Sequence, residues 1–252
     1  MTLNRRRACL SLAAGFGAAP THAQASAPLL IAVDSQNPPF MYQAKGEGAA
    51  RGVYPVLLRA VFKQLGEPLQ LLPMPWARAL AGLERAEHGV GGLYANRERL
   101  AKFDYGQPIL TETVRVYVQR GRLRRFDGLD DLRGLRVGVL RGWSYGDEFD
   151  TARKAGLLKV EDVTDDRANF GKLERDFLDV VLSVEQTGEQ VMASGEFPSV
   201  RAMPNPLTEN PAYLAFHKSR QQQGLLARID EVVAQLRRSG EHARLVAQGL
   251  RD

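Results

Sequence analysis

Cysteine is nearly absent from this chain of 252 residues, because Cys9 is the only one. It lies in an N-terminal segment with the features of a signal peptide. These are Arg5–Arg7, an apolar run over 8–19, and Ala23-Gln24-Ala25, which fits the small-x-small rule of signal peptidase. Removal of this segment would leave no thiol, which excludes disulfides, cysteine metal ligands and a cysteine nucleophile. No Leu-rich lipobox precedes Cys9, so we expect no lipid anchor.

Long hydrophobic runs are missing as well. The run over 8–19 is shorter than the roughly 20 apolar residues that span a bilayer, and no later run is longer. We predict a signal peptide over 1–25, whose removal leaves 227 of the 252 residues, enough for one large domain or two lobes. We therefore expect a soluble periplasmic protein. The Arg6-Arg7 pair leaves the general and the twin-arginine export routes both open.

A strong charge of one sign is also lacking. The net charge of +5 includes three arginines of the predicted signal peptide, so the mature chain is near +2. No Lys/Arg-rich run with interleaved aromatics is present, and we expect no nucleic-acid partner. The four histidines, at 22, 88, 217 and 242, lack metal-ligand spacing, so neither a metal nor another cofactor is expected. Neither a Gly-x-Ser-x-Gly elbow nor a pair of carboxylates for acid–base work can be located in the sequence, so we expect no catalytic residues.

Strand-like and helical segments alternate along the rest of the chain. The apolar run Leu29–Val33 predicts a first strand, which Asn37-Pro38-Pro39 ends. Val53–Leu65 has helical spacing and Gly66 stops it, while Asn96 is placed to cap a helix through Leu100. Further expected strands are 69–74, 90–94, 114–118, 135–140, 160–163, 177–183 and 213–216, and further helices are 76–85, 147–155, 167–174, 187–194, 221–236 and 241–250. This alternation predicts an α/β fold with mainly parallel sheets.

The alternation of strands and helices begins again after Val118, which predicts two lobes. We assign 28–116 to the first part of lobe 1, 117–212 to lobe 2, and 213–252 to a return to lobe 1. The strands at 114–118 and 213–216 would then cross between the lobes.

Several short motifs occur in a characteristic order: Asn37-Pro38-Pro39-Phe40, Gly52-Val53-Tyr54, Pro75-Trp76, Asn96-Arg97-Glu98-Arg99, Phe103-Asp104-Tyr105, and Asp131-Leu132-Arg133-Gly134-Leu135-Arg136-Val137-Gly138-Val139. Together they resemble the amino-acid-type extracellular solute-binding proteins of ABC importers (bacterial solute-binding protein family 3). The resemblance implies a two-lobed periplasmic-binding-protein fold, in which a mainly parallel sheet flanked by helices forms each lobe. Two crossing strands would form the hinge, and the ligand would lie in the cleft.

The resemblance implies that Arg99 pairs with a ligand carboxylate, which the fork of a guanidinium matches in a bidentate way. Asn96 replaces the family's threonine and could cap the helix while offering its amide to the ligand. The alternative for Arg99 is a place among surface ion pairs, because Glu98, Arg97 and Lys102 are all nearby.

The resemblance also suggests three ligand-binding residues earlier in lobe 1. Phe40 would line the cleft, with core packing as the alternative. Trp76 could stack on a ligand or belong to the core. Arg78 lies in the first turn of its helix, where the helix dipole disfavours a cation, so a binding role competes with plain solvent exposure.

In lobe 2 the turn Gly142–Gly146 joins a strand to a helix, and such a turn exposes backbone N–H groups to an anion. The resemblance implies that Ser144 donates its hydroxyl there and that Trp143 or Tyr145 closes over the ligand. A simple tight turn is the alternative.

One position departs from the family's pattern. Relatives that bind α-amino acids carry an aspartate where this chain has Val184. Glu185 could take its place, or it could be a solvated residue at a helix start, and an α-amino group on the ligand is therefore an open question.

We expect the periplasmic substrate-binding component of an ABC importer, a monomer that binds an amino acid or another small carboxylate and meets a membrane permease. The alternatives are an enzyme of the cyclohexadienyl or arogenate dehydratase type on the same fold, and a solute-sensing module. A buried carboxyl of raised pKa that faces the ligand would favour the dehydratase, and Glu185 is the candidate in the sequence.

Overall fold

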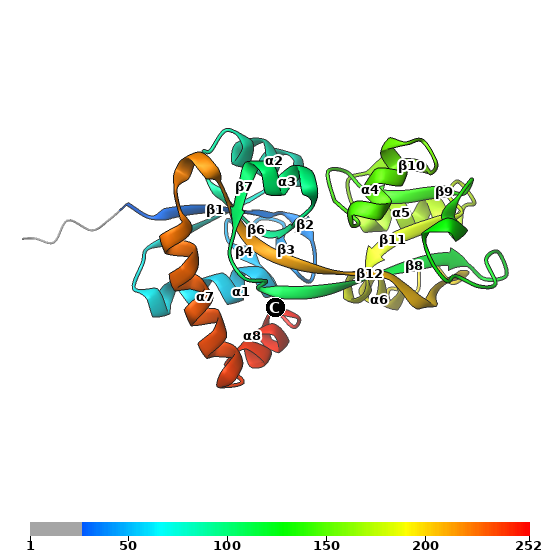
Figure 1. The fold of residues 1–252 in the computed structure, drawn as a ribbon. Helices are drawn as coiled ribbons and strands as arrows, with labels where there is room; N and C mark the ends of the chain where they lie inside the picture. The colour runs from blue at the N-terminus through cyan, green and yellow to red at the C-terminus, as the bar shows by residue number, and fades with distance from the viewer. Residues whose placement is uncertain (1–26) are drawn as a thin grey trace, which may run out of the picture.

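The computed structural model describes residues 27–252, which form two lobes joined by two long strands (Figure 1). The predicted signal peptide, residues 1–25, lies outside the described residues.

Lobe 1, on the left of Figure 1, is built on three parallel strands. Strand β1 (Leu29–Asp34) lies between β5 (Leu69–Met74) and β6 (Gly89–Tyr94). The helices of lobe 1 are α1 (Val53–Leu65), α2 (Trp76–Glu84), α3 (Arg97–Lys102), η2 (Lys218–Arg220), α7 (Gln223–Arg238) and α8 (Glu241–Gly249). Lobe 1 also contains β7 (Phe103–Tyr105) and a small sheet of β2 (Gln36–Asn37), β3 (Met41–Gln43) and β4 (Ala50–Arg51). Helices α7 and α8 pack against α1, so the end of the chain returns to lobe 1.

Lobe 2 repeats the parallel arrangement. Strand β9 (Arg136–Leu140) lies between β10 (Lys159–Val163) and β11 (Val180–Val184), parallel to both. The other elements of lobe 2 are η1 (Leu129–Leu132), α4 (Asp147–Lys154), α5 (Asp166–Glu174) and α6 (Glu185–Ala193).

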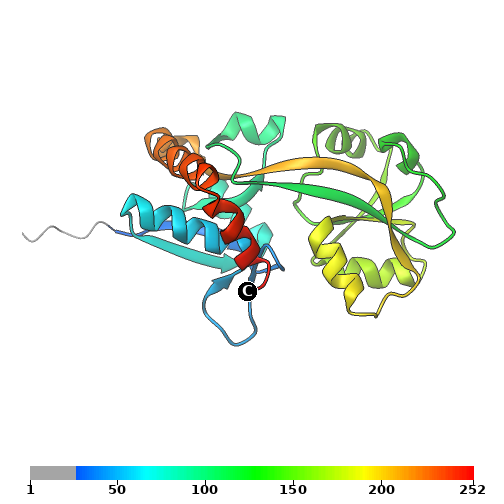
Figure 2. The same ribbon diagram turned by 90° about the horizontal axis from the view of Figure 1, so that it is seen from below.

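The two long strands, β8 (Leu110–Gln119) and β12 (Val200–His217), run antiparallel from one lobe to the other. Figure 2 shows them side by side across the gap between the lobes. Because β12 pairs with β6 in lobe 1 and β8 pairs with β11 in lobe 2, both lobes share one nine-stranded sheet. The predicted two-lobed α/β fold with two crossing strands is confirmed.

Strand β12 is much longer than the strand predicted over 213–216. It contains Pro204, Pro206 and Pro211, all exposed, and proline ordinarily argues against a strand because it cannot donate to the ladder. The pairing with β8 is irregular on both sides of Pro206, which is how the prolines are accommodated.

The motifs around Phe40 and Gly52 form one structural unit. The carbonyls of Pro39 and Phe40 accept from the first N–H groups of α1, those of Val53 (3.2 Å) and Tyr54 (2.9 Å). Gly52 has a φ of 99°, and a Cβ there would lie 2.5 Å from the Pro39 oxygen, so only glycine lets the two segments meet. The predicted helix over Val53–Leu65 is confirmed, and it ends at Gly66 in the left-handed conformation.

The main hydrophobic core runs through both lobes along the crossing strands, and a smaller one lies around Tyr117 and Phe170. Within residues 27–252, no helix combines the length and apolar character needed to cross a bilayer.

Candidate functional site

The predicted site residues follow the carboxyl ends of parallel strands in both lobes, where open α/β sheets bind ligands. Tyr94 ends β6 in lobe 1 and is followed by Asn96, while the turn Gly142–Gly146 follows β9 in lobe 2. The lobes touch in this region, so the two sets of residues meet across the cleft.

Arg99 lies at the centre of this meeting. Its Nη1 donates to the Tyr94 carbonyl (2.8 Å), and its Nη2 donates across the cleft to the Gly142 carbonyl (2.7 Å). Burial lowers the pKa of its guanidinium, although the group stays charged. None of the ion pairs among the described residues involves Arg99, so its charge lacks a carboxylate partner. The alternative, a surface ion pair of Arg99, does not occur within residues 27–252, and Glu98 pairs with Lys102 and Lys154 instead.

Asn96 is the N-cap of α3, as predicted, since its Oδ1 accepts from the Arg99 N–H at 2.9 Å. Its Nδ2 donates to Ser144 Oγ (3.2 Å) and to Asp150 Oδ2 (3.1 Å) in lobe 2. The Ser144 hydroxyl in turn donates to Asp150 at 2.5 Å. A polar network therefore joins the lobes beside Arg99.

An aromatic cluster from both lobes lies beside this network. The rings of Trp76 and Trp143 are 6.1 Å apart, and Tyr94 meets Trp143 edge-on at 5.5 Å. The indole N–H of Trp76 donates to the Gly142 carbonyl at 3.4 Å. Gly142 has a φ of 77°, a left-handed conformation that lets its carbonyl meet both Trp76 and Arg99.

Four predicted residues take no part in these contacts. Phe40 is 2% exposed and packs on Tyr54 within lobe 1. Tyr145 is buried inside lobe 2, where its ring packs on Phe149 and its hydroxyl accepts from the Leu140 N–H at 2.9 Å. Arg78 is exposed on α2. Glu185 forms an ion pair with Arg115 of β8.

Sequence reasoning missed Glu112 of β8, because a single glutamate next to an apolar strand carries no motif. It is 2% exposed and accepts from the hydroxyls of Tyr54 and Tyr94, one on each carboxylate oxygen. Burial raises its pKa to about 7, while the two tyrosine hydroxyls lower it. Glu112 thus connects the start of α1 and the end of β6 to a crossing strand.

Two further buried acids, Asp34 and Asp166, were also missed, although Asp34 ends the predicted first strand. Each is 5% exposed. Burial raises the pKa of Asp34 to about 6 and that of Asp166 to about 7. On this side of the cleft, the Thr187 hydroxyl of lobe 2 donates to the Pro38 carbonyl of lobe 1 at 3.1 Å.

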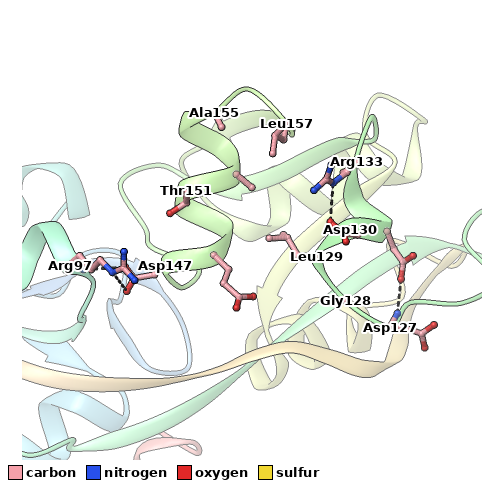
Figure 3. Close-up of a pocket in the computed structure, with 13 residues that line it drawn as sticks. Arg97, Asp127, Gly128, Leu129, Asp130, Arg133, Asp147, Thr151, Ala155 and Leu157 are labelled. Atoms are coloured by element: carbon pink, nitrogen blue, oxygen red, sulfur yellow. Dashed lines mark hydrogen bonds and ion pairs between the residues drawn. The ribbon is translucent and has the colours of Figure 1, made fainter.

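A cavity of about 760 Å³ lies elsewhere, between η1 and α4 (Figure 3). Figure 3 shows Arg97 directed at Asp147, and the two charged groups are 3.7 Å apart. None of the predicted site residues lines this cavity. Within residues 27–252, no group of three or more histidine, cysteine, aspartate or glutamate residues is arranged to hold a metal ion.

Known proteins resemble this chain in sequence and in fold. The L-cystine-binding protein TcyJ of Escherichia coli (strain K12) is 23% identical over 222 residues, which cover 84% of this chain and 78% of that protein. A histidine kinase sensor domain with similarity to periplasmic binding proteins has a TM-score of 0.77 at 19% identity, covering 88% of this chain and 96% of its own. An ancestral arginine-binding protein bound to arginine has a TM-score of 0.75 at 20% identity, covering 89% and 99%.

The structural likenesses concern the fold. The sequence match is broader, because residues 29–250 match one family throughout, so that nearly the whole described part of the chain is included. This chain belongs to the bacterial extracellular solute-binding proteins, family 3.

Proposed function

We propose that this chain is the periplasmic substrate-binding component of an ABC importer and that it binds an amino acid through its carboxylate. Arg99 is the observation that carries the proposal, since it is a half-buried guanidinium between two lobes with no carboxylate partner among residues 27–252. A ligand carboxylate would supply the missing charge, and such charge-assisted pairs are among the stronger polar contacts.

The family and the relatives support this proposal. TcyJ is named for binding L-cystine, and the ancestral structure is bound to arginine. In our proposal, lobe 1 (28–116 and 213–252) and lobe 2 (117–212) close around the ligand at the crossing strands. The closed monomer then meets a membrane permease.

Isothermal titration of the purified chain with the L-amino acids tests the proposal. Arg99→Ala should weaken binding of any amino acid ligand by about 10- to 100-fold, because a charged hydrogen-bonded pair is lost. Arg238→Ala is the matched control, since Arg238 is exposed on α7 and is not among the predicted site residues. Unchanged affinity in folded Arg99→Ala would contradict the role of Arg99, and no binding of any L-amino acid would contradict the proposal.

A dehydratase of the cyclohexadienyl type is the second candidate, because buried carboxyls of raised pKa are present. Glu185 is only partly buried and pairs with Arg115, whereas Glu112 and Asp166 are buried carboxyls whose pKa is raised. Incubation of the purified protein with prephenate or arogenate distinguishes the two functions. We expect no turnover, and loss of a measurable turnover in Glu112→Gln or Asp166→Asn would establish the enzyme instead.

A further inference from the structure

Tyr94, at the end of β6, makes contacts in three directions. Its hydroxyl donates to Glu112 of the crossing strand β8, and its ring meets Trp143 of lobe 2 edge-on at 5.5 Å. Its carbonyl accepts from Arg99 Nη1 at 2.8 Å. Tyr94 is 4% exposed, so its ring is enclosed by these neighbours. The position of this one residue therefore affects both the guanidinium of the candidate site and the way lobe 2 meets lobe 1.

Glu112 holds the hydroxyl end of Tyr94. One carboxylate oxygen accepts from Tyr94, and the other accepts from Tyr54 at the start of α1. A buried tyrosine hydroxyl needs a hydrogen-bond partner, and a bond to a carboxylate is stronger than a bond between two neutral groups. Without Glu112, the Tyr94 hydroxyl would lose this partner inside the protein, and we expect the ring to leave its present orientation.

The position of Glu112 on the crossing strand links this contact to the hinge. Glu112 lies opposite Asn210 of β12 in the strand ladder. Asn210 is 7% exposed, and its Nδ2 donates to the Ser144 carbonyl at 3.4 Å, in the lobe 2 turn that Arg99 reaches. At one level of the two crossing strands, side chains therefore contact the wall of the cleft in lobe 1 and the wall in lobe 2.

Stability alone does not explain a glutamate at this position. Burial raises the pKa of Glu112 to about 7, although the two tyrosine hydroxyls lower it, so the ionised carboxylate is unfavourable here. Apolar side chains of similar volume often replace buried charged groups without loss of stability. A buried hydrogen-bonded network, in contrast, fixes the side chains that it joins in a single arrangement.

We infer that Glu112 is a positioning residue for ligand binding and that it acts through Tyr94. By holding the Tyr94 hydroxyl, it fixes the ring that Trp143 meets when the lobes close. The inference rests on the proposed function, in which Arg99 binds the ligand carboxylate, because the Tyr94 carbonyl is one of the two acceptors that orient this guanidinium. Glu112 itself has both oxygens bonded to tyrosines and acts without touching the ligand.

Two conservative variants test the inference, because each removes one of the two hydroxyls bonded to Glu112. Urea unfolding should show that Tyr94→Phe and Tyr54→Phe are both folded and similarly destabilised. In isothermal titration with the standard L-amino acids and L-cystine, Tyr94→Phe should weaken binding about tenfold. Tyr54→Phe should leave the affinity within about twofold of that of the unmodified protein, because the Tyr54 ring packs on Phe40 inside lobe 1.

Variants of Glu112 separate positioning from a merely structural role. Glu112→Ala should weaken binding as much as Tyr94→Phe does, and the double variant should be no weaker than either, because both changes break one contact. Glu112→Gln can still bond to both hydroxyls and should restore most of the affinity. If Glu112→Ala does not fold, the comparison of Tyr94→Phe with Tyr54→Phe decides alone.

Unchanged affinity in Tyr94→Phe, or equal losses of affinity in Tyr94→Phe and Tyr54→Phe, would overturn the inference and leave the proposed function intact. Independent effects of Glu112→Ala and Tyr94→Phe on the Kd, which multiply in the double variant, would overturn it as well. If the unmodified protein binds neither an L-amino acid nor L-cystine, both the proposed function and the inference are wrong.

Discussion

At the scale of single residues, the interior of this protein contains acids that are unfavourable unless protonated or paired. Glu112, with Tyr54 and Tyr94 bonded to its two oxygens, is the most enclosed example. The two hydroxyls do not fully compensate for burial, because the pKa of Glu112 is raised to about 7.

Glu112 should make stability depend on pH. The folded protein holds a proton on Glu112 up to about pH 7, whereas an unfolded chain releases it near pH 4.5, so the free energy of unfolding falls as the pH rises between these values. Asp34 and Asp166 contribute in the same direction, since their pKa values are raised to about 6 and about 7. Glu112→Gln removes one of the three contributions.

We expect the unfolding free energy of Glu112→Gln, relative to the unmodified protein, to rise by about 2 to 3 kcal/mol between pH 5 and pH 8. Urea unfolding at both pH values measures this difference. The exposed control Glu189→Gln should leave the dependence unchanged. The same pH dependence of the unfolding free energy in Glu112→Gln and in the unmodified protein would show that Glu112 does not titrate in this range.

At the scale of elements, the turn between β9 and α4 decides how the lobes meet. Gly142 has a φ of 77°, and its carbonyl accepts from Arg99 and Trp76 of the other lobe. A Cβ at this position would lie 3.2 Å from Leu80 Cδ1 and 3.6 Å from Trp76 Cδ1, both in lobe 1. A methyl group here would therefore be wedged between the lobes.

Gly142→Ala should consequently cost both stability and affinity. The left-handed backbone costs about 1 to 2 kcal/mol for alanine, and the methyl group should weaken ligand binding several-fold by hindering closure. Gly134→Ala is a matched control, because Gly134 has the same φ of 77° and open space around its Cβ. Thermal unfolding and titration calorimetry should show equal destabilisation in the two variants and weaker binding only in Gly142→Ala. Equal ligand affinities of Gly142→Ala and Gly134→Ala would contradict the idea that the added methyl group hinders closure.

At the scale of the whole molecule, closure should be visible in tryptophan fluorescence. The chain has two tryptophans, Trp76 in lobe 1 and Trp143 in lobe 2, and their rings are 6.1 Å apart where the lobes meet. Opening of the lobes would separate these rings and expose them to water.

We expect a saturable change in fluorescence intensity and wavelength when the ligand is added, with a midpoint equal to the calorimetric Kd. Trp143→Phe should leave a smaller change from Trp76 alone. An unchanged spectrum at saturating ligand would mean that these lobes do not move relative to each other on binding.

The exposed ion pairs between the lobes, Arg97 with Asp147 and Glu98 with Lys154, contribute little to closure. Such surface pairs are worth about 0 to 1 kcal/mol and are screened by salt. We therefore expect the buried groups of the cleft to contribute more to closure than these pairs do.

The sequence by itself determined the main helices and parallel strands and their order, but not the short strands β2, β3, β4 and β7 or the length of β12. Local signals specify helix α1 and the cap at Asn96, because left-handed glycines and capping side chains act within a few residues. The alternation of strands and helices, together with the order of the motifs, was sufficient to predict the two-lobed fold. The strand over 177–183 was placed too early, since β11 begins at Val180 and Phe177 is 60% exposed.

Only the tertiary structure decided which side chains share the cleft. Trp76, Asn96 and Arg99 meet Trp143 and Ser144 because two lobes, built from distant segments, close on each other. Phe40 and Tyr145 have the same aromatic character in the sequence but pack inside their own lobes. Glu112, Asp34 and Asp166 become notable only through burial, and burial depends on contacts between residues far apart in the chain, which no local pattern encodes.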